Sequence, residues 1–152
     1  MKALLAVTLV ALSLTACAGS KPFQPPLAAF EVWHKPGVSN LGIKKALLEC
    51  GMPHPESESL PPKPMRTDNE RAETENCLLA AGYRMPADYS HWCTLRPDLP
   101  ACQPGVKPPT PSVERRMNSN YCRARQDMEF CRKTVSNPSA CTGGPIEPEC
   151  VP

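Results

Sequence analysis

The sequence predicts a small, mainly α-helical, disulfide-rich protein in which short helices are joined by Pro-rich irregular segments. The chain of 152 residues contains nine cysteines and 20 prolines. From Pro22 onward there are 20 Leu, Ile, Val and Phe residues, about 15% of residues 17–152. A chain so poor in large apolar residues cannot bury enough surface to hold one structure unaided. In small exported domains, disulfides supply the missing constraint.

Residues 1–16 have the organisation of a signal peptide. Lys2 gives a positive start, and the apolar run from Ala3 to Leu14 is too short for a permanent transmembrane helix. The run ends in Leu14-Thr15-Ala16-Cys17, which resembles the lipobox of bacterial lipoproteins. The resemblance implies cleavage before Cys17 and lipidation of its thiol, so that acyl chains anchor the protein to a membrane.

An ordinary secretory signal, cut after Ala16 or Ala18, is the alternative. It would leave Cys17 as a free thiol. The cysteine count favours lipidation, because nine cysteines cannot all pair, whereas the eight that follow Cys17 can. By analogy with the lipoprotein class, Ala18 after the lipidated cysteine indicates sorting to the outer membrane of a Gram-negative cell.

The charge of the mature chain argues against one class of partner. Without Lys2, 16 basic residues are balanced by 15 acidic ones. Such a balance gives no electrostatic footprint for nucleic acid. Nucleic acid is therefore not among the predicted partners.

The first part of the mature chain divides into a tether and a domain. Residues 17–30 are predicted to be a lipidated tether, since they contain prolines and no apolar periodicity. Residues 31–103 are predicted to form a small disulfide-stapled helical domain. It begins with a short strand or extended segment around Trp33, from Glu31 to Lys35.

Two helices are predicted in this domain. The first begins at a cap on Ser39 or Asn40 and ends at Gly51; its apolar face consists of Ile43, Ala46, Leu47 and Cys50. The second begins with the capping-box pattern Thr67-Asp68-Asn69-Glu70 and ends at Gly82; its apolar stripe consists of Thr74, Cys77, Leu78 and Ala81. Each helix thus carries a cysteine near the C-terminal end of its apolar face.

The rest of the chain is predicted to be a linker, a helix and a tail. Residues 104–111 form a Pro-rich linker, and residues 112–152 comprise a helix plus a Cys/Pro-rich tail. The helix extends from Ser112 to about Lys133, with the apolar stripe Val113, Met117, Tyr121, Ala124 and Met128. Its basic side chains are expected to form a solvated face, with a peptidoglycan or lipopolysaccharide contact as the alternative: Arg115, Arg116, Arg123, Arg125, Arg132 and Lys133.

All eight cysteines after Cys17 are predicted to form disulfides. Three pairs share a spacing of nine residues, which favours local bridges: Cys93–Cys102, Cys122–Cys131 and Cys141–Cys150. The two helix cysteines, Cys50 and Cys77, are then left to join each other.

The Cys122–Cys131 bridge conflicts with the predicted third helix. Nine helical residues rise about 13.5 Å, whereas bridged cysteines need Cα atoms within about 4.4–6.8 Å. Either the chain turns between the two cysteines, or each pairs with another element, through Cys102, Cys141 or Cys150. The equal spacings favour the local bridge.

Metal and catalytic sites are not predicted. His91 and Cys93 are the only close His/Cys pair in the sequence, and His34 and His54 have no partner at ligand spacing. Neither a Cys-x-x-Cys pair nor a Ser/His/Asp set with a matching context is present. The sequence therefore predicts neither a cofactor nor an enzyme.

Two stretches carry a family resemblance. One has the pattern W-x-K-x-G followed by a helix that ends in cysteine, and the other has the pattern C-(M/L)-x-x-x-G-aromatic: Trp33 to Cys50, and Cys77 to Tyr83. These patterns resemble a group of small Gram-negative outer-membrane lipoproteins, over roughly residues 30–102. A looser likeness, to the small lipoproteins of the β-barrel assembly machinery, rests on Gly37, Ser39, Ile43, Leu47, Gly51 and Pro53.

The resemblance implies an envelope lipoprotein and assigns no activity. We therefore predict a membrane-anchored envelope lipoprotein with a structural or protein-interaction role and no catalysis. Its expected partners are the membrane, through the lipid anchor, and an envelope protein or peptidoglycan. The alternative is a surface-exposed binding module, an adhesin or an inhibitor.

Overall fold

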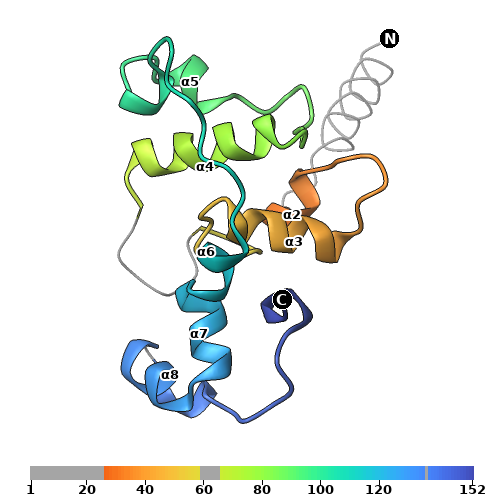
Figure 1. The fold of residues 1–152 in the computed structure, drawn as a ribbon, viewed down its shortest axis with the longest axis vertical. Helices are drawn as coiled ribbons and strands as arrows, with labels where there is room; N and C mark the ends of the chain where they lie inside the picture. Colours follow the sequence, from red (N-terminus) through yellow and green to blue (C-terminus); the bar gives the residue numbers. More distant parts are fainter. Residues whose placement is uncertain (1–25, 59–65, 136) are drawn as a thin grey trace, which may run out of the picture.

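The computed structural model describes residues 26–58, 66–135 and 137–152. Cys17 and the predicted signal peptide lie outside these residues. In the described part, seven α-helices and three 3-10 helices are joined by irregular segments and four disulfides (Figure 1). This confirms the predicted small, mainly α, disulfide-rich fold class.

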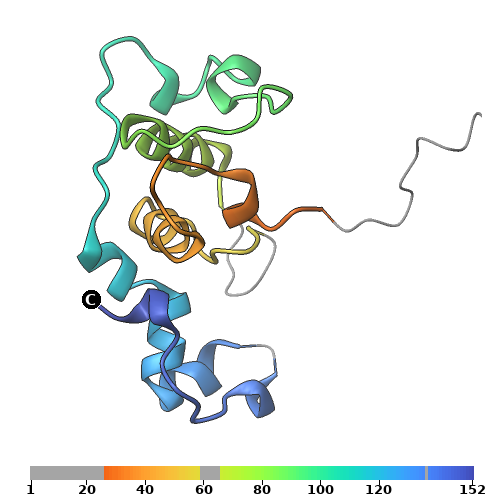
Figure 2. The same ribbon diagram turned by 90° about the vertical axis from the view of Figure 1, so that its right-hand side faces the viewer.

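The helices are short and are spread along the longest axis of the molecule in an order that differs from their order in the chain. The α-helices are α2 (Ala29–Val32), α3 (Asn40–Glu49), α4 (Asp68–Ala80), α5 (Trp92–Leu95), α6 (Val113–Met117), α7 (Asn120–Gln126) and α8 (Met128–Thr134). The 3-10 helices are η1 (Pro100–Cys102), η2 (Pro138–Ala140) and η3 (Pro148–Cys150). In Figures 1 and 2, α5 and α4 lie at one end, α2 and α3 in the middle, and α7 and α8 at the other end. The C-terminus returns to the middle, where η3 packs on α3.

The first two predicted helices are confirmed as α3 and α4. Ser39 caps α3 by accepting a hydrogen bond from the Gly42 amide, and Gly51 follows with φ of +96°. Thr67 and Glu70 form the predicted capping box of α4. Because the two helices bury the expected stripes, they close over one core cluster: Trp33, Ile43, Ala46, Leu47, Cys50, Met52, Cys77, Leu78 and Tyr83.

The segment before α3 is partly helical. The sequence predicts a strand or extended segment from Glu31 to Lys35, but Glu31 belongs to α2, and only the residues after Val32 are extended. His34 then forms a single antiparallel bridge with Arg84. Phe30, which the sequence assigns to the tether, packs against the core cluster.

The predicted third helix is wrong as a single element. It is divided into α6, α7 and α8, with breaks at Ser119 and Asp127. The Ser119 hydroxyl accepts from the Cys122 amide at 3.2 Å, and an Asp127 carboxylate oxygen accepts from Glu129 and Phe130 at 2.9 and 3.0 Å. Such side chains give the backbone an alternative to continuing the helix. As a result Tyr121 is buried, while Val113 of the same predicted stripe is half exposed.

Two disulfides join the cysteines that the spacing pairs. Cys50–Cys77 links the C-terminal ends of α3 and α4, with a Cα–Cα distance of 5.6 Å. Cys93–Cys102 links α5 to η1, with a Cα–Cα distance of 5.2 Å. This local loop lies over α4, where Leu99 and Ala101 pack on Ala72.

The other two predicted bridges, Cys122–Cys131 and Cys141–Cys150, are wrong. The structure joins Cys122 to Cys150 and Cys131 to Cys141, with Cα–Cα distances of 5.1 and 5.9 Å. The chain does turn between Cys122 and Cys131, at Asp127, and yet the two cysteines meet different partners. Cys122 is fully buried against η3, and α8 faces η2. The break in the helix was therefore not sufficient for a local bridge.

Among the described residues, no helix combines the length and the apolar character that a membrane span needs.

Candidate functional site

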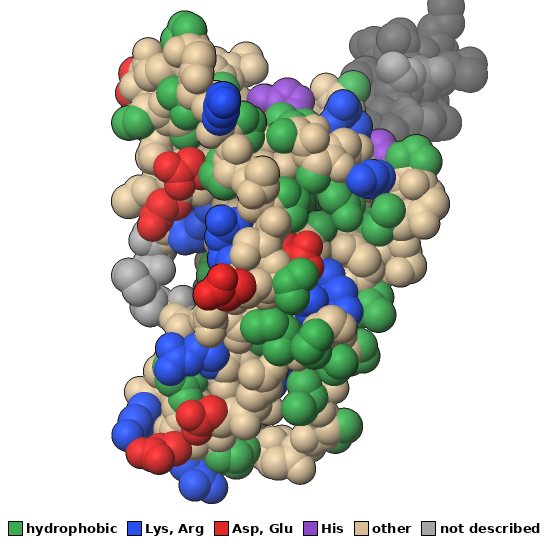
Figure 3. All heavy atoms as spheres, viewed as in Figure 1, with side chains coloured by type: hydrophobic (Ala, Val, Ile, Leu, Met, Phe, Trp, Pro, Cys, Tyr) green, Lys and Arg blue, Asp and Glu red, His purple; other side chains and the backbone are tan. Residues whose placement is uncertain are grey.

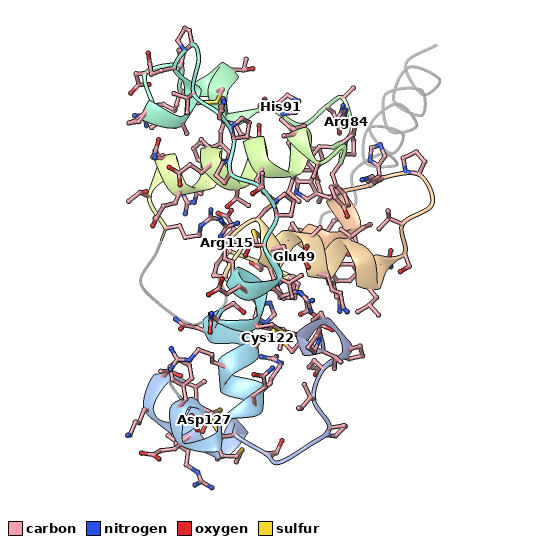
Figure 4. All side chains as sticks on the ribbon, viewed as in Figure 1. Glu49, Arg84, His91, Arg115, Cys122 and Asp127 are labelled. Carbon is pink, nitrogen blue, oxygen red and sulfur yellow. A yellow bond between two sulfur atoms is a disulfide. The ribbon has the colours of Figure 1, made fainter. Side chains whose placement is uncertain are left out.

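A groove lies beside α7 and α8. It has a volume of about 740 Å³, and we call it the C-terminal groove. One wall is formed by α7, α8 and the Cys131–Cys141 disulfide, and the other by residues 142–148. His54, from the loop after α3, closes one end. In Figure 4 the C-terminal segment bows away from α7 and then approaches it again near Cys122.

A buried arginine holds the segment of chain that follows the groove. The side chain of Arg116 on α6 is 2% exposed, and its Nε donates to Glu49 Oε1 on α3 at 3.0 Å. Its Nη1 donates to the carbonyl oxygens of Glu149 and Val151, each at 2.6 Å. A guanidinium suits this position, since it can satisfy several acceptors in fixed directions. We call this set of contacts the Arg116 clamp; it holds the end of the chain against α3.

A tyrosine–carboxylate pair adjoins the Arg116 clamp. Tyr121 Oη donates to Glu149 Oε1 at 2.6 Å, and Lys44 Nζ lies 4.0 Å from the same oxygen. Burial of the ring and this hydrogen bond raise the pKa of Tyr121, so the phenol stays protonated and acts as a donor. Glu149 is 3% exposed, and a buried carboxyl group needs polar partners, which Tyr121 and Lys44 provide.

Two further side chains pack on the Tyr121 ring. His54 meets it edge-on, with 4.7 Å between ring centroids, and the Arg125 guanidinium lies 3.5 Å from the ring centroid. His54 Nδ1 accepts from the Glu56 amide at 3.2 Å, which places the proton of the neutral ring on Nε2. Burial is the main cause that lowers the pKa of His54, so this histidine is neutral near pH 7. The groove thus contains one cation, the Arg125 guanidinium, and one neutral histidine, His54, whose Nε2–H can donate a hydrogen bond.

The histidines and the cysteine considered as metal ligands from the sequence each have other surroundings in the structure. In the described ranges, no three His, Cys, Asp or Glu side chains are grouped so that they could hold a metal ion. His91 Nδ1 contacts Glu75 Oε1 at 2.9 Å, and Glu75 also accepts from the Trp92 amide at 3.1 Å. Cys93, two positions from His91, is bonded to Cys102.

The sequence did not indicate the groove or the Arg116 clamp. Arg116 was expected on a solvated face, and no local pattern distinguishes it from Arg115. Its partners Glu49 and Glu149 are 67 and 33 positions away in the chain. The residues named from the sequence that line the groove are His54, Tyr121, Ala124, Arg125, Cys131 and Cys141, and Cys122 anchors its wall.

No family model, curated protein or solved structure matches this chain.

Proposed function

We propose that this chain is an outer-membrane lipoprotein, anchored through Cys17, whose role is to contact another envelope component without catalysis. The single observation that carries the proposal is the partition of the nine cysteines. Eight of them form four disulfides. Disulfides persist in exported proteins, and the one cysteine left over follows Leu14-Thr15-Ala16, as a lipobox requires.

The structure also supports the contact role. Four bridges and the Arg116 clamp hold short helices that could not be stable alone, and helices of this length need such constraints. The result is a groove whose walls come from α7, α8 and residues 142–148 and whose end is closed by His54, from a distant part of the chain. A surface fixed in this way suits binding, because its side chains and loops lose little conformational entropy on association.

The anchor is tested by replacing its acceptor. In cells that make the full chain, Cys17→Ser should abolish incorporation of labelled fatty acid, because no other residue has a lipobox before it. The matched control is Cys93→Ser with Cys102→Ser, which removes a different pair of thiols and should keep the label. Continued labelling of Cys17→Ser would contradict the lipoprotein assignment.

The side of the membrane is tested on intact cells. An amine reagent that does not cross the outer membrane should leave Lys107 and Lys133, both exposed, unmodified if the protein faces the periplasm. Modification without permeabilisation would instead favour the surface-exposed binding module. Permeabilised cells provide the control that both lysines can react.

A further inference from the structure

We propose that the C-terminal groove binds a short extended peptide that carries both a carboxylate and an ammonium group. The inference rests on the proposed contact role and not on the lipid anchor. The volume of the groove, about 740 Å³, lies within the range of pockets that hold small ligands, about 300–1,000 Å³.

The charges of the groove are the first argument. Arg125 and Glu147 both line it and both are exposed. Within the described ranges, no oppositely charged side chain lies within 4.0 Å of either, whereas three nearby bases are paired: Arg116 with Glu49, Lys44 with Glu149, and Lys133 with Glu129. The groove therefore presents one cation and one anion that the protein itself does not neutralise. A ligand with both charges would complement it, and a simple anion would complement only half of it.

The orientation of Arg125 is the second argument. Its guanidinium stacks on Tyr121, and its Nη1 donates to the Tyr121 carbonyl oxygen at 3.0 Å. Tyr121 is itself held by Glu149 and His54. The Nε and Nη2 groups of Arg125 donate to no other described residue, so they are left for a carboxylate, which a guanidinium binds through two donors.

An apolar stretch of the groove wall is the third argument. Ile146 is 48% exposed and lies beside Pro145 and Pro148, which gives an apolar strip along the groove. The amides of Ile146 and Glu147 donate to no acceptor in the described chain. An extended peptide can accept from such amides while its small side chains lie on the strip, which is how peptides are bound along open backbone edges. His54 is neutral near pH 7 and adds no second cation.

Alanine peptides with free termini test the ligand class, because their terminal ammonium and carboxylate are their only charged groups. Tri-, tetra- and penta-alanine place the ammonium and the carboxylate up to roughly 10–18 Å apart. Each is titrated into the purified full-length mature protein in detergent, and the amide resonances of Ala124, Arg125 and Ile146 are followed by NMR. We expect saturable shifts at these amides, with one length bound most tightly. N-terminal acetylation or C-terminal amidation of that peptide should each weaken binding about tenfold, the loss of one charge-assisted hydrogen-bond pair.

Variants of the protein separate a bound peptide from general charge effects. Arg125→Gln and Glu147→Gln should each weaken binding about tenfold. The Glu147 carboxylate forms no hydrogen bond or ion pair with another described residue, so its replacement should leave the fold intact. Arg123→Gln is the matched control: it removes a cation from the same helix, where Arg123 stacks on Phe130 and does not line the groove, and it should leave binding unchanged.

Three results would overturn the proposal. They are no saturable shift with any peptide at millimolar concentration, equal binding of the blocked peptides, or shifts with acetate alone as large as with the peptide, which would make the groove a general anion site. A mature protein that fails in these ways but is acylated at Cys17 would leave the envelope assignment standing.

Discussion

In the N-terminal region, residues 29–102, α3 and α4 close over a cluster of nine buried side chains, whereas the cluster that the C-terminal region, residues 112–151, helps to form has four. One of those four, Leu48, is supplied by α3. The C-terminal region instead buries Arg116 and Glu149 and contains two disulfides in about 40 residues. The comparison teaches that where apolar side chains are scarce, covalent links and charge-assisted hydrogen bonds take over the task of fixing an irregular chain.

The difference is visible on the surface as well. Figure 3 shows basic and acidic side chains side by side over the end of the molecule that contains α7 and α8. Arg123 stacks on Phe130 and Lys133 pairs with Glu129 there. These exposed contacts are each worth about 1 kcal/mol or less. They cannot replace a core, so the two disulfides and the Arg116 clamp must hold this region.

The largest expected effect comes from opening one matched disulfide in each region. Cys50–Cys77 and Cys122–Cys150 close loops of nearly equal separation, 27 and 28 residues. In the chain-entropy model each contributes about 3.6 kcal/mol. We expect replacement of Cys122 and Cys150 by alanine to release residues 142–152, which follow the remaining Cys131–Cys141 bridge, so that trypsin cuts rapidly after Arg123 and Arg125.

Replacement of Cys50 and Cys77 by alanine is the matched experiment. It should lower the unfolding free energy by a similar amount, yet leave α3 and α4 resistant to protease, because seven other buried side chains still join them. Denaturant unfolding and timed digestion of both variants measure this. Equal protease sensitivity in the two regions would mean that the apolar core does not distinguish them.

The Arg116 clamp gives the next largest effect. Arg116→Met keeps the length of the side chain but leaves Glu49 and two carbonyl oxygens without their donor. Breaking a buried pair costs about 3–5 kcal/mol, and partial exposure of Glu49, 19%, reduces this to about 2–3 kcal/mol. Denaturant unfolding should show this loss. Arg132→Met, which removes an exposed cation on α8, is the control and should change stability by less than about 0.5 kcal/mol. A similar loss in both variants would show that net charge, and not the clamp, is responsible.

The smallest effect concerns pH and belongs to the N-terminal region. Hydrogen bonds from the amide and the hydroxyl of Thr67 hold the pKa of Glu70 below its ordinary value of 4.5. A carboxyl whose folded pKa is depressed stabilises the fold above its unfolded pKa, and this contribution is lost as the pH falls from about 4.5 through the folded value. The protection factors of the amides at the start of α4, which correct for the slower intrinsic exchange in acid, should therefore fall below about pH 4.5.

Glu70→Gln cannot titrate, so it should lack this pH dependence and serves as the control. Thr67→Ala removes the other half of the capping box and should cost about 1 kcal/mol at neutral pH. A pH profile that is the same in Glu70→Gln as in the unmodified protein would assign the effect to other carboxyl groups.

The two regions also differ in how far their sequences predict them. In α3 and α4, the cap, the periodic stripe and the terminal glycine lie within one short stretch and agree, so Ser39 to Gly51 could be predicted from neighbours alone. After residue 112 the local signals disagree. The stripe from Val113 to Met128 favours one helix, while Ser119 and Asp127 offer competing caps, and the caps prevail. Once the helix is divided, the rotation of Cys122 relative to Cys131 can no longer be read from spacing.

What the sequence determined by itself is therefore everything that depends on near neighbours: the helical class, the two N-terminal helices with their caps, and the Cys93–Cys102 bridge. Only the tertiary structure decided which partners Cys122 and Cys131 take, that Arg116 is buried, and that Arg125 and Glu147 line the same groove. The reason is physical. Capping and helical periodicity act over three or four residues, whereas the donors and acceptors of the Arg116 clamp are up to 67 positions apart and meet only when the chain has closed on α3.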